Sequence, residues 1–192
     1  MRCSAVFLPL CALLAVSAHA QSDLDTETQS ARALASQLVL QLGGKLKAEL
    51  AAGGPQAAIQ VCRQAAPDLA GKLSREQGIR VARVSLRVRN PLLGTADAWE
   101  QQGLAEFERR AAGGEKAESL EIAAFVDEPA GRYFRFIKAI PVQPMCLSCH
   151  GTPADIPAAV REELRIQYPL DRAIGYSVGQ VRGAVTIKKA LD

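Results

Sequence analysis

The sequence predicts an α+β fold, in which N-terminal helices precede a small antiparallel sheet with flanking helices. Leu34, Leu38, Leu42 and Leu46 recur every four residues, which is the spacing of one face of an amphipathic helix. Between residues 79 and 89, apolar and polar residues alternate, and this period of two is typical of a strand with one buried face. Helical patterns come first and strand patterns later, which favours an α+β domain over an alternating α/β one.

Three helical segments are expected before the first strand. The first covers residues 23–50 and ends at Gly53-Gly54. Pro55 suits the first turn of a second helix, because proline lacks only an N–H that has no intrahelical partner there. Pro67 disfavours helical backbone at the residue before it, so a third helical piece is expected from there to Glu76.

The remaining elements follow from period and from turn residues. Asn90-Pro91 closes the first strand, and Glu128-Pro129-Ala130-Gly131 marks a hairpin turn between two later strands. The expected elements are strands at 79–89, 120–126, 132–140 and 183–188, and helices at 97–112 and 156–168.

The first twenty residues predict a secretory signal peptide. Arg2 gives a positive start, residues 6–16 form an apolar core, and Ala18-His19-Ala20 matches an A-x-A cleavage site. The apolar stretch is shorter than the roughly 20 residues that a membrane-spanning helix needs. We therefore expect a periplasmic chain of residues 21–192, folded as a single domain, with no membrane insertion of the mature chain.

Charge and composition name no partner. The chain has 23 basic and 20 acidic side chains, and removal of the signal takes away only Arg2, which leaves 22 − 20 = +2. No clustering of basic and aromatic residues indicates nucleic-acid binding. In residues 21–192 the remaining candidates for metal ligation by sulfur or imidazole are few: Cys62, Met145, Cys146, Cys149 and His150.

The motif Cys146-Leu147-Ser148-Cys149-His150 predicts one covalently attached c-type haem. Two thiols at this spacing meet the two vinyl groups, and the adjacent imidazole reaches the iron from one face. The attachment chemistry operates outside the cytoplasm, which agrees with the signal peptide. Haem c is thus the expected cofactor, with His150 as one axial ligand.

The second axial ligand can be approached by elimination. His150 is the only histidine after the signal, and Met145 directly precedes Cys146, so its sulfur is poorly placed for the opposite face. Cys62, a lysine, a tyrosine, the amino terminus, water or no ligand remain. Cys62 is the best candidate, because it is the odd thiol of an exported chain and lies on a face of small residues that lets a flat macrocycle approach.

The same cysteines also allow two other kinds of site. A disulfide between Cys146 and Cys149 would resemble a thioredoxin-like pair, but the βαβ setting of such a pair is absent. A zinc site of Cys62, Cys146, Cys149 and His150 is a permissible ligand set, although adjacent Cys149 and His150 would share one tetrahedron awkwardly. Arginines on the predicted strands offer a further expectation: Arg87, Arg89 and Arg135 are candidate contacts for the haem propionates.

Several segments together resemble a known family. They resemble the PAS-like c-type haem-binding domain family with mixed His/Cys axial ligation, described first in a cyanobacterial protein. The resemblance implies a PAS-like sheet, haem bonded to Cys146 and Cys149, and axial ligation by His150 and Cys62. The segments that carry it are Ala58 to Cys62 with Ala66-Pro67, Ser85 to Pro91 with Trp99-Glu100, Phe134 to Lys138, Cys146 to Gly151, Tyr168 to Asp171, Gly175-Tyr176, Gly179 and Arg182 to Ala184.

Function follows from the expected ligand pair. A thiolate opposite histidine stabilises ferric iron and lowers the potential relative to Met/His ligation. We expect a redox or gas sensor that works by ligand exchange at Cys62 and is read by a separate periplasmic or membrane redox or signalling protein. A low-potential electron-transfer cytochrome is the alternative. An enzyme such as a peroxidase ranks last, because the sole histidine is already committed to iron.

Overall fold

A four-stranded antiparallel sheet forms the centre of the fold, with helices on both faces. The structure is a computed structural model that describes residues 11–191, with side chains from residue 22 onward. Residues 1–10 of the expected signal lie outside the described residues, so the export segment stays a prediction. The strand order is β1-β4-β3-β2, and the strands are β1 Arg80–Val84, β2 Glu121–Glu128, β3 Gly131–Pro141 and β4 Val181–Ala190.

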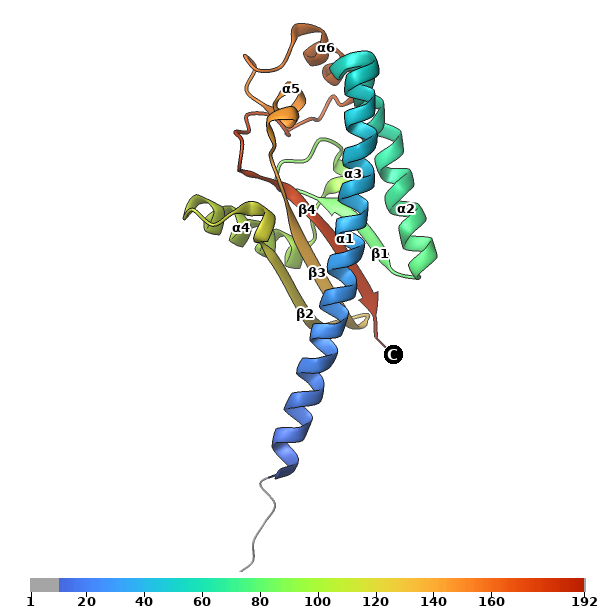
Figure 1. Cartoon of the computed structure of the whole chain (residues 1–192), viewed down its shortest axis with the longest axis vertical. Helices are drawn as coiled ribbons and strands as arrows, with labels where there is room; N and C mark the ends of the chain where they lie inside the picture. Colours follow the sequence, from blue (N-terminus) through green and yellow to red (C-terminus); the bar gives the residue numbers. More distant parts are fainter. Residues whose placement is uncertain (1–10, 192) are drawn as a thin grey trace, which may run out of the picture.

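Helices lie on both sides of this sheet, and some of them lie together beyond one end of it (Figure 1). α1 crosses one face of the sheet, and α5, α6 and the last turns of α1 lie together beyond one end of the strands. The helical elements are α1 Cys11–Gln60, the π-helical turn η1 Val61–Ala65, α2 Ala66–Gln77, α3 Pro91–Gly94, α4 Ala98–Ala112, the 3₁₀ turns η2 Ala117–Ser119 and η3 Pro144–Cys146, α5 Leu147–His150 and α6 Ala158–Gln167.

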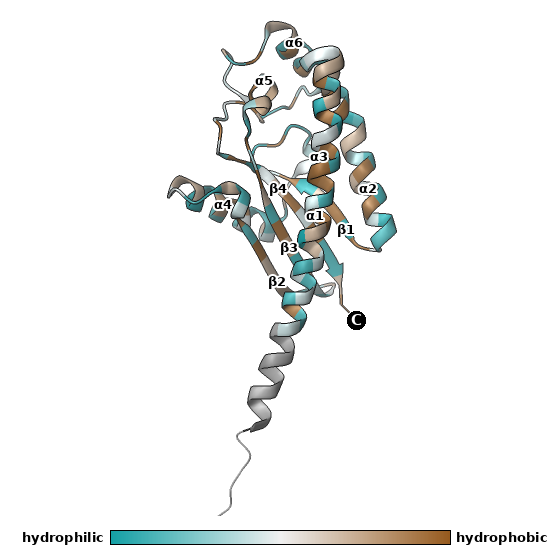
Figure 2. Cartoon of the chain, viewed as in Figure 1, coloured by the Kyte–Doolittle hydropathy of each residue, from teal (hydrophilic) through white to brown (hydrophobic). Residues whose placement is uncertain are grey.

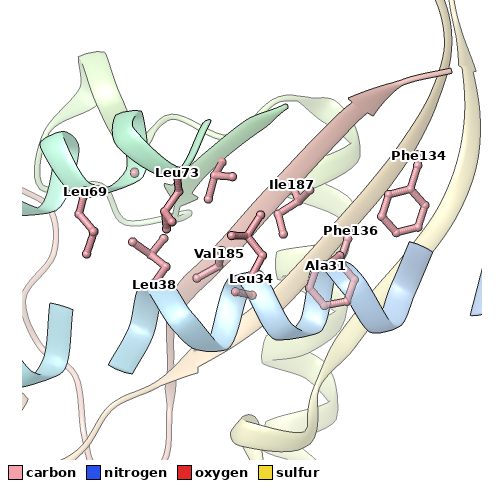
Figure 3. Close-up of a cluster of buried hydrophobic side chains, with 12 residues drawn as sticks. Ala31, Leu34, Leu38, Leu69, Leu73, Phe134, Phe136, Val185 and Ile187 are labelled. Atoms are coloured by element: carbon pink, nitrogen blue, oxygen red, sulfur yellow. The ribbon is translucent and has the colours of Figure 1, made fainter. Parts of the chain in front are cut away.

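One face of the sheet packs against α1 and α2. Leu34 and Leu38 of the expected leucine stripe are buried there, and Leu42 packs partly against the same cluster. Figure 3 shows Leu69 and Leu73 of α2 meeting side chains of α1 and of the strands in this layer. In Figure 2, hydrophobic residues recur along α1, α2 and β3 between hydrophilic ones. The spacing of four therefore predicted the buried face of α1 correctly.

The opposite face packs against α4. Strand residues alternate between the faces, so Phe134 and Phe136 point to α1 while Ile137 points to α4 and joins Leu104 and Phe107. α4 begins at the expected place, because the side chain of Asp97 accepts a hydrogen bond from the N–H of Glu100 in a capping box. The structure confirms the α+β class and the hairpin between β2 and β3, which turns between Glu128 and Gly131.

Two element boundaries differ from the expectation. Helical structure continues through Gly53, and the break is a kink at Gly54 (φ 73°), a left-handed conformation that glycine adopts without strain. β1 ends at Val84, although the alternation runs on to residue 89. Ser85 leaves the ladder because its hydroxyl donates to the carbonyl of Arg182 at 2.8 Å and its N–H donates to the carbonyl of Gly94.

Among the described residues, no helix combines the length and the apolar character that crossing a membrane requires.

Candidate functional site

The CxxCH segment forms two short helical turns at the end of β3. Cys146 closes the 3₁₀ turn η3, and Leu147 to His150 form α5. The N–H of Gly151 then donates to the carbonyl oxygen of Leu147 at 2.9 Å, which ends α5 directly after the imidazole. A Cβ atom at position 151 would lie 2.7 Å from that same oxygen, so only glycine fits this turn.

A second loop is hydrogen-bonded to this segment. The N–H of Tyr176 donates to the carbonyl oxygen of His150 at 2.9 Å, and the N–H of Gly175 donates to that of Gly151 at 2.7 Å. Tyr176 is buried, and its ring meets the imidazole edge-on with the centroids 6.3 Å apart. The loop that leads into β4 therefore determines where the His150 ring lies.

The imidazole of His150 is held in one tautomer. Its Nδ1 lies 2.7 Å from the backbone carbonyl oxygen of Ala173. Because a carbonyl oxygen only accepts, Nδ1 carries the proton and Nε2 keeps a free lone pair. Burial, reinforced by the charges of Arg182 and Arg89, holds the pKa of His150 well below its usual range. The ring is neutral at pH 7 and presents Nε2 as a metal ligand, which is the arrangement of histidine ligands in metal sites.

Arg182, at the start of β4, packs against this imidazole. Its Nε lies 3.2 Å from Nδ1 and 3.4 Å from Nε2 of His150. These nearly equal distances place the guanidinium over the face of the ring, so the in-plane Nε2 lone pair stays open. The guanidinium also donates from Nη1 to the hydroxyl of Ser85 at 3.0 Å. Burial lowers the pKa of Arg182 to about 10.

Cys62 lies on the π-helical turn between α1 and α2. Such turns are rare and occur often at functional sites. Burial raises the pKa of the Cys149 thiol; the charge of Arg89 opposes the rise, and proximity to Cys62 adds to it. Cys149 also packs against a buried cluster that includes Ile59, three residues before Cys62. The fold thus brings the lone thiol from position 62 to the CxxCH segment, 84 or more residues later in the chain.

A cavity of about 290 Å³ adjoins Cys62. Its walls come from α2, β1, the turn around α3 and the first residues of β4, and they are largely apolar. Three arginines, Arg83, Arg89 and Arg182, line it, and none of the described lining residues is an aspartate or a glutamate. An apolar slot with a thiol and several cations is suited to a flat, apolar ligand that carries acidic groups.

Of the three arginines expected at the propionates, Arg89 is the one that contacts the CxxCH segment. It is buried, with Nε 2.9 Å from the Asp171 carboxylate and Nη2 bonded to the carbonyl oxygen of Cys149. Its hydrogen bonds position the segment, and its charge is already balanced by Asp171. Arg87 instead lies over the ring of Tyr176, 3.6 Å from the centroid, and donates to the carbonyl of Ile174.

Arg135 is placed elsewhere. It lies under α4, where its guanidinium contacts the carboxylates of Asp97 at 2.6 Å, Glu128 at 2.5 Å and Glu100 at 3.4 Å. Pro141, at the end of β3, lies six positions further along the strand, a distance of about 20 Å. The structure does not bring Arg135 together with His150. The period-two pattern placed Arg135 in a strand. It could not predict that acidic side chains from other segments would pair with its guanidinium.

The other uses of the cysteines find no support. The structure shows Cys62, Cys146 and Cys149 each as free thiols. Within residues 22–191, no three histidine, cysteine or acidic side chains converge as the ligands of a metal site do.

Three contributors to the site were missed by reasoning from residue patterns: Asp171, Ala173 and Arg182. Ala173 acts through its backbone carbonyl, which no side-chain pattern can reveal. Asp171 and Arg182 occurred only within the segments that carry the family resemblance. The acidic partner of Arg89 lies 82 positions away, so only long-range structure pairs them.

A family model described as Tll0287-like matches residues 12–189. This chain belongs to the Tll0287-like family. The Tll0287-like match covers both Cys62 and the CxxCH segment. A solved structure, described as that of the cyanobacterial heme-protein Tll0287, is similar with a TM-score of 0.64, 23% identity, and coverage of 87% of this chain and 96% of that one. At this identity the likeness establishes the fold alone. A search of curated proteins found no match.

Proposed function

We propose that this member of the Tll0287-like family binds one haem c, attached through Cys146 and Cys149, with His150 and Cys62 as axial ligands in a PAS-like domain. The observation that carries the proposal is the neutral imidazole of His150, whose Nδ1–H is fixed on Ala173 and whose Nε2 is left for iron. The matched solved structure is described as a heme-protein, and this agrees with the proposal.

The residues that line the cavity suit one side of such a group, and Cys146, Cys149 and His150 are not among them. Cys62 lines the cavity wall, and the mostly apolar lining suits the macrocycle. Arginines on the lining suit its acidic edge. Haem bound there supplies a one-electron centre whose potential depends on its two axial ligands.

We further propose that Cys62 is the exchangeable ligand of a redox or gas sensor. A thiolate favours ferric iron, so reduction weakens its hold, and protonation of the released thiol keeps it away from the metal. Cys62 belongs to the π-helical turn that joins α1 to α2, and its release would change the constraint on the α1–α2 junction. A separate redox or signalling protein would read that change.

A low-potential electron-transfer protein is the second candidate. It is favoured by the tight fixation of His150, whose carbonyl, Nδ1 and ring all have partners. We do not propose an enzyme, because residues 21–192 hold no second histidine to serve as an acid or base beside the iron. The Ala18-His19-Ala20 site and the extracytoplasmic attachment of haem c together support a periplasmic location.

Expression with a cytochrome c maturation system tests the proposal. Mass spectrometry of the purified chain should show cleavage after Ala20 and the added mass of one haem that denaturation does not remove. Cys146→Ala with Cys149→Ala should abolish this covalent addition. Spectra of the reduced protein with and without CO then separate the two functions: a new CO band supports the sensor, and an unchanged spectrum supports the electron carrier.

A further inference from the structure

The cavity beside Cys62 has an excess of positive charge at one end. Arg83, Arg89 and Arg182 line this end, and among the described residues Asp171 is the acid that acts on it. Asp171 is bound to Arg89 at 2.9 Å. No described carboxylate lies within 4.0 Å of Arg83 or Arg182. Two of the three cations therefore lack an acidic partner within the fold.

Neutral groups hold Arg182 in this position. Nη1 donates to the hydroxyl of Ser85 at 3.0 Å and to the carbonyl of Arg87 at 3.3 Å. These acceptors orient the guanidinium but leave its charge uncompensated. A buried guanidinium is stabilised by a bound anion far more than an exposed guanidinium is.

Arg182 also lies against the imidazole of His150. Its Nε is 3.2 Å from Nδ1 and 3.4 Å from Nε2, and these nearly equal distances place it over the face of the ring. The guanidinium therefore sits beside the ring that the proposed function assigns to iron and leaves the in-plane Nε2 lone pair open.

We propose that Arg83 and Arg182 bind the two carboxylates of the ligand in this cavity, the haem propionates. This inference rests on the proposed function. It replaces Arg87 and Arg135 in the propionate role and leaves Arg89 as the residue that positions the CxxCH segment.

Reversible binding tests the assignment. In the Cys146→Ala/Cys149→Ala chain, haem binds without a covalent bond, so dissociation constants can be measured for haem and for its dimethyl ester, in which both propionates are neutral. With Arg83 and Arg182 present, the ester should bind about tenfold or more weakly, as expected for loss of charge-assisted hydrogen bonds. In Arg182→Gln, the ratio of the two dissociation constants should fall to about the square root of the parent's ratio or less. This is expected because one of the two arginine–propionate pairs is gone.

Matched variants guard against a trivial result. Arg132→Gln removes an exposed cation at the far end of β3, paired with Asp127 at 3.8 Å, and should keep full discrimination. Arg182→Lys keeps the positive charge and should keep part of the discrimination between haem and its ester. If Arg182→Gln does not fold by circular dichroism, Arg83→Gln and Arg182→Lys decide instead.

The outcomes are distinct. Full discrimination in Arg182→Gln and Arg83→Gln would overturn this inference while haem binding stands. Failure of the folded double variant to bind haem while the matured wild-type chain carries covalent haem would overturn this inference alone. Absence of covalent haem from the matured wild-type chain would overturn the proposed function, and the inference with it.

Discussion

Arg89 joins the CxxCH segment to the loop before β4: it donates to the carbonyl oxygen of Cys149 and to the carboxylate of Asp171. Both side chains are buried, with about a tenth of each exposed. The loop that carries Ala173, the partner of the His150 ring, follows Asp171 directly, and the Asp171 carboxylate accepts from the N–H of Ala173 at 2.7 Å. One ion pair therefore couples two segments that together orient the imidazole.

Arg89→Gln should destabilise the protein strongly. It leaves the Asp171 carboxylate buried without its cation, which costs about 3–5 kcal/mol of the free energy of unfolding. For a chain of this size that lowers Tm by on the order of 10 °C. Thermal unfolding followed by circular dichroism measures the shift. Arg109→Gln, which breaks an exposed pair with Glu106 on α4, is the control and should leave Tm unchanged.

Cys62→Ala should change the iron spectrum without unfolding the chain. The thiolate EPR signature should vanish, and the midpoint potential should rise by about 0.1 V or more, since loss of an anionic ligand destabilises ferric iron. Electron paramagnetic resonance and a redox titration of the haem-loaded variant provide the measurement. Spectra identical to those of the parent would make Cys62 a packing residue.

Gly151→Ala should cost about 1–3 kcal/mol, because the new Cβ would lie 2.7 Å from the backbone oxygen of Leu147, which has little freedom to move. The control is Gly44→Ala, at a helical position of α1 where a Cβ meets nothing within 4 Å. That change should stabilise the helix by up to about 1 kcal/mol. Urea unfolding of both variants measures the change in the free energy of unfolding. Equal changes in the two variants would contradict the close contact at position 151.

Asp97 should make stability depend on pH at the acid end. Burial opposes its ionisation, but the N–H of Glu100 and the guanidinium of Arg135 outweigh it and lower the pKa of the carboxyl below its ordinary 3.8. A carboxyl with a lowered pKa in the folded state stabilises the protein above about pH 4, and this contribution is lost as the pH falls further.

Asp97→Asn keeps a good helix cap and removes the charge. It should lower the free energy of unfolding at pH 7 by about 1 kcal/mol or less, because the carboxylate is partly exposed. Near pH 3 the difference from the parent should shrink. Denaturant unfolding at both pH values measures it, and a gap that is constant across this range would argue against the Asp97–Arg135 pair.

Local patterns were sufficient for most of the elements. The leucine spacing identified the buried face of α1, the helical pattern from Asp97 onward identified the start of α4, and the turn residues up to Gly131 identified the hairpin, because each depends on residues a few positions apart. The alternation at residues 79–89 predicted a strand that continues beyond Val84, and this was wrong. The hydroxyl of Ser85 donates to the carbonyl of Arg182, 97 residues away, and the strand ends there.

The sequence by itself determined the CxxCH motif, the one histidine of residues 21–192 and the odd thiol of that range, because those are matters of residue type and short spacing. Only the tertiary structure decided that Cys62 lies near enough to Cys149 to affect its charge, that Ala173 selects the tautomer of His150, and that Arg89 is neutralised while Arg182 is not. Those relationships depend on distances between segments far apart in the chain, and charge compensation depends on which side chains share a buried space. Both arise when the sheet and helices pack, and no periodicity in a single segment contains them.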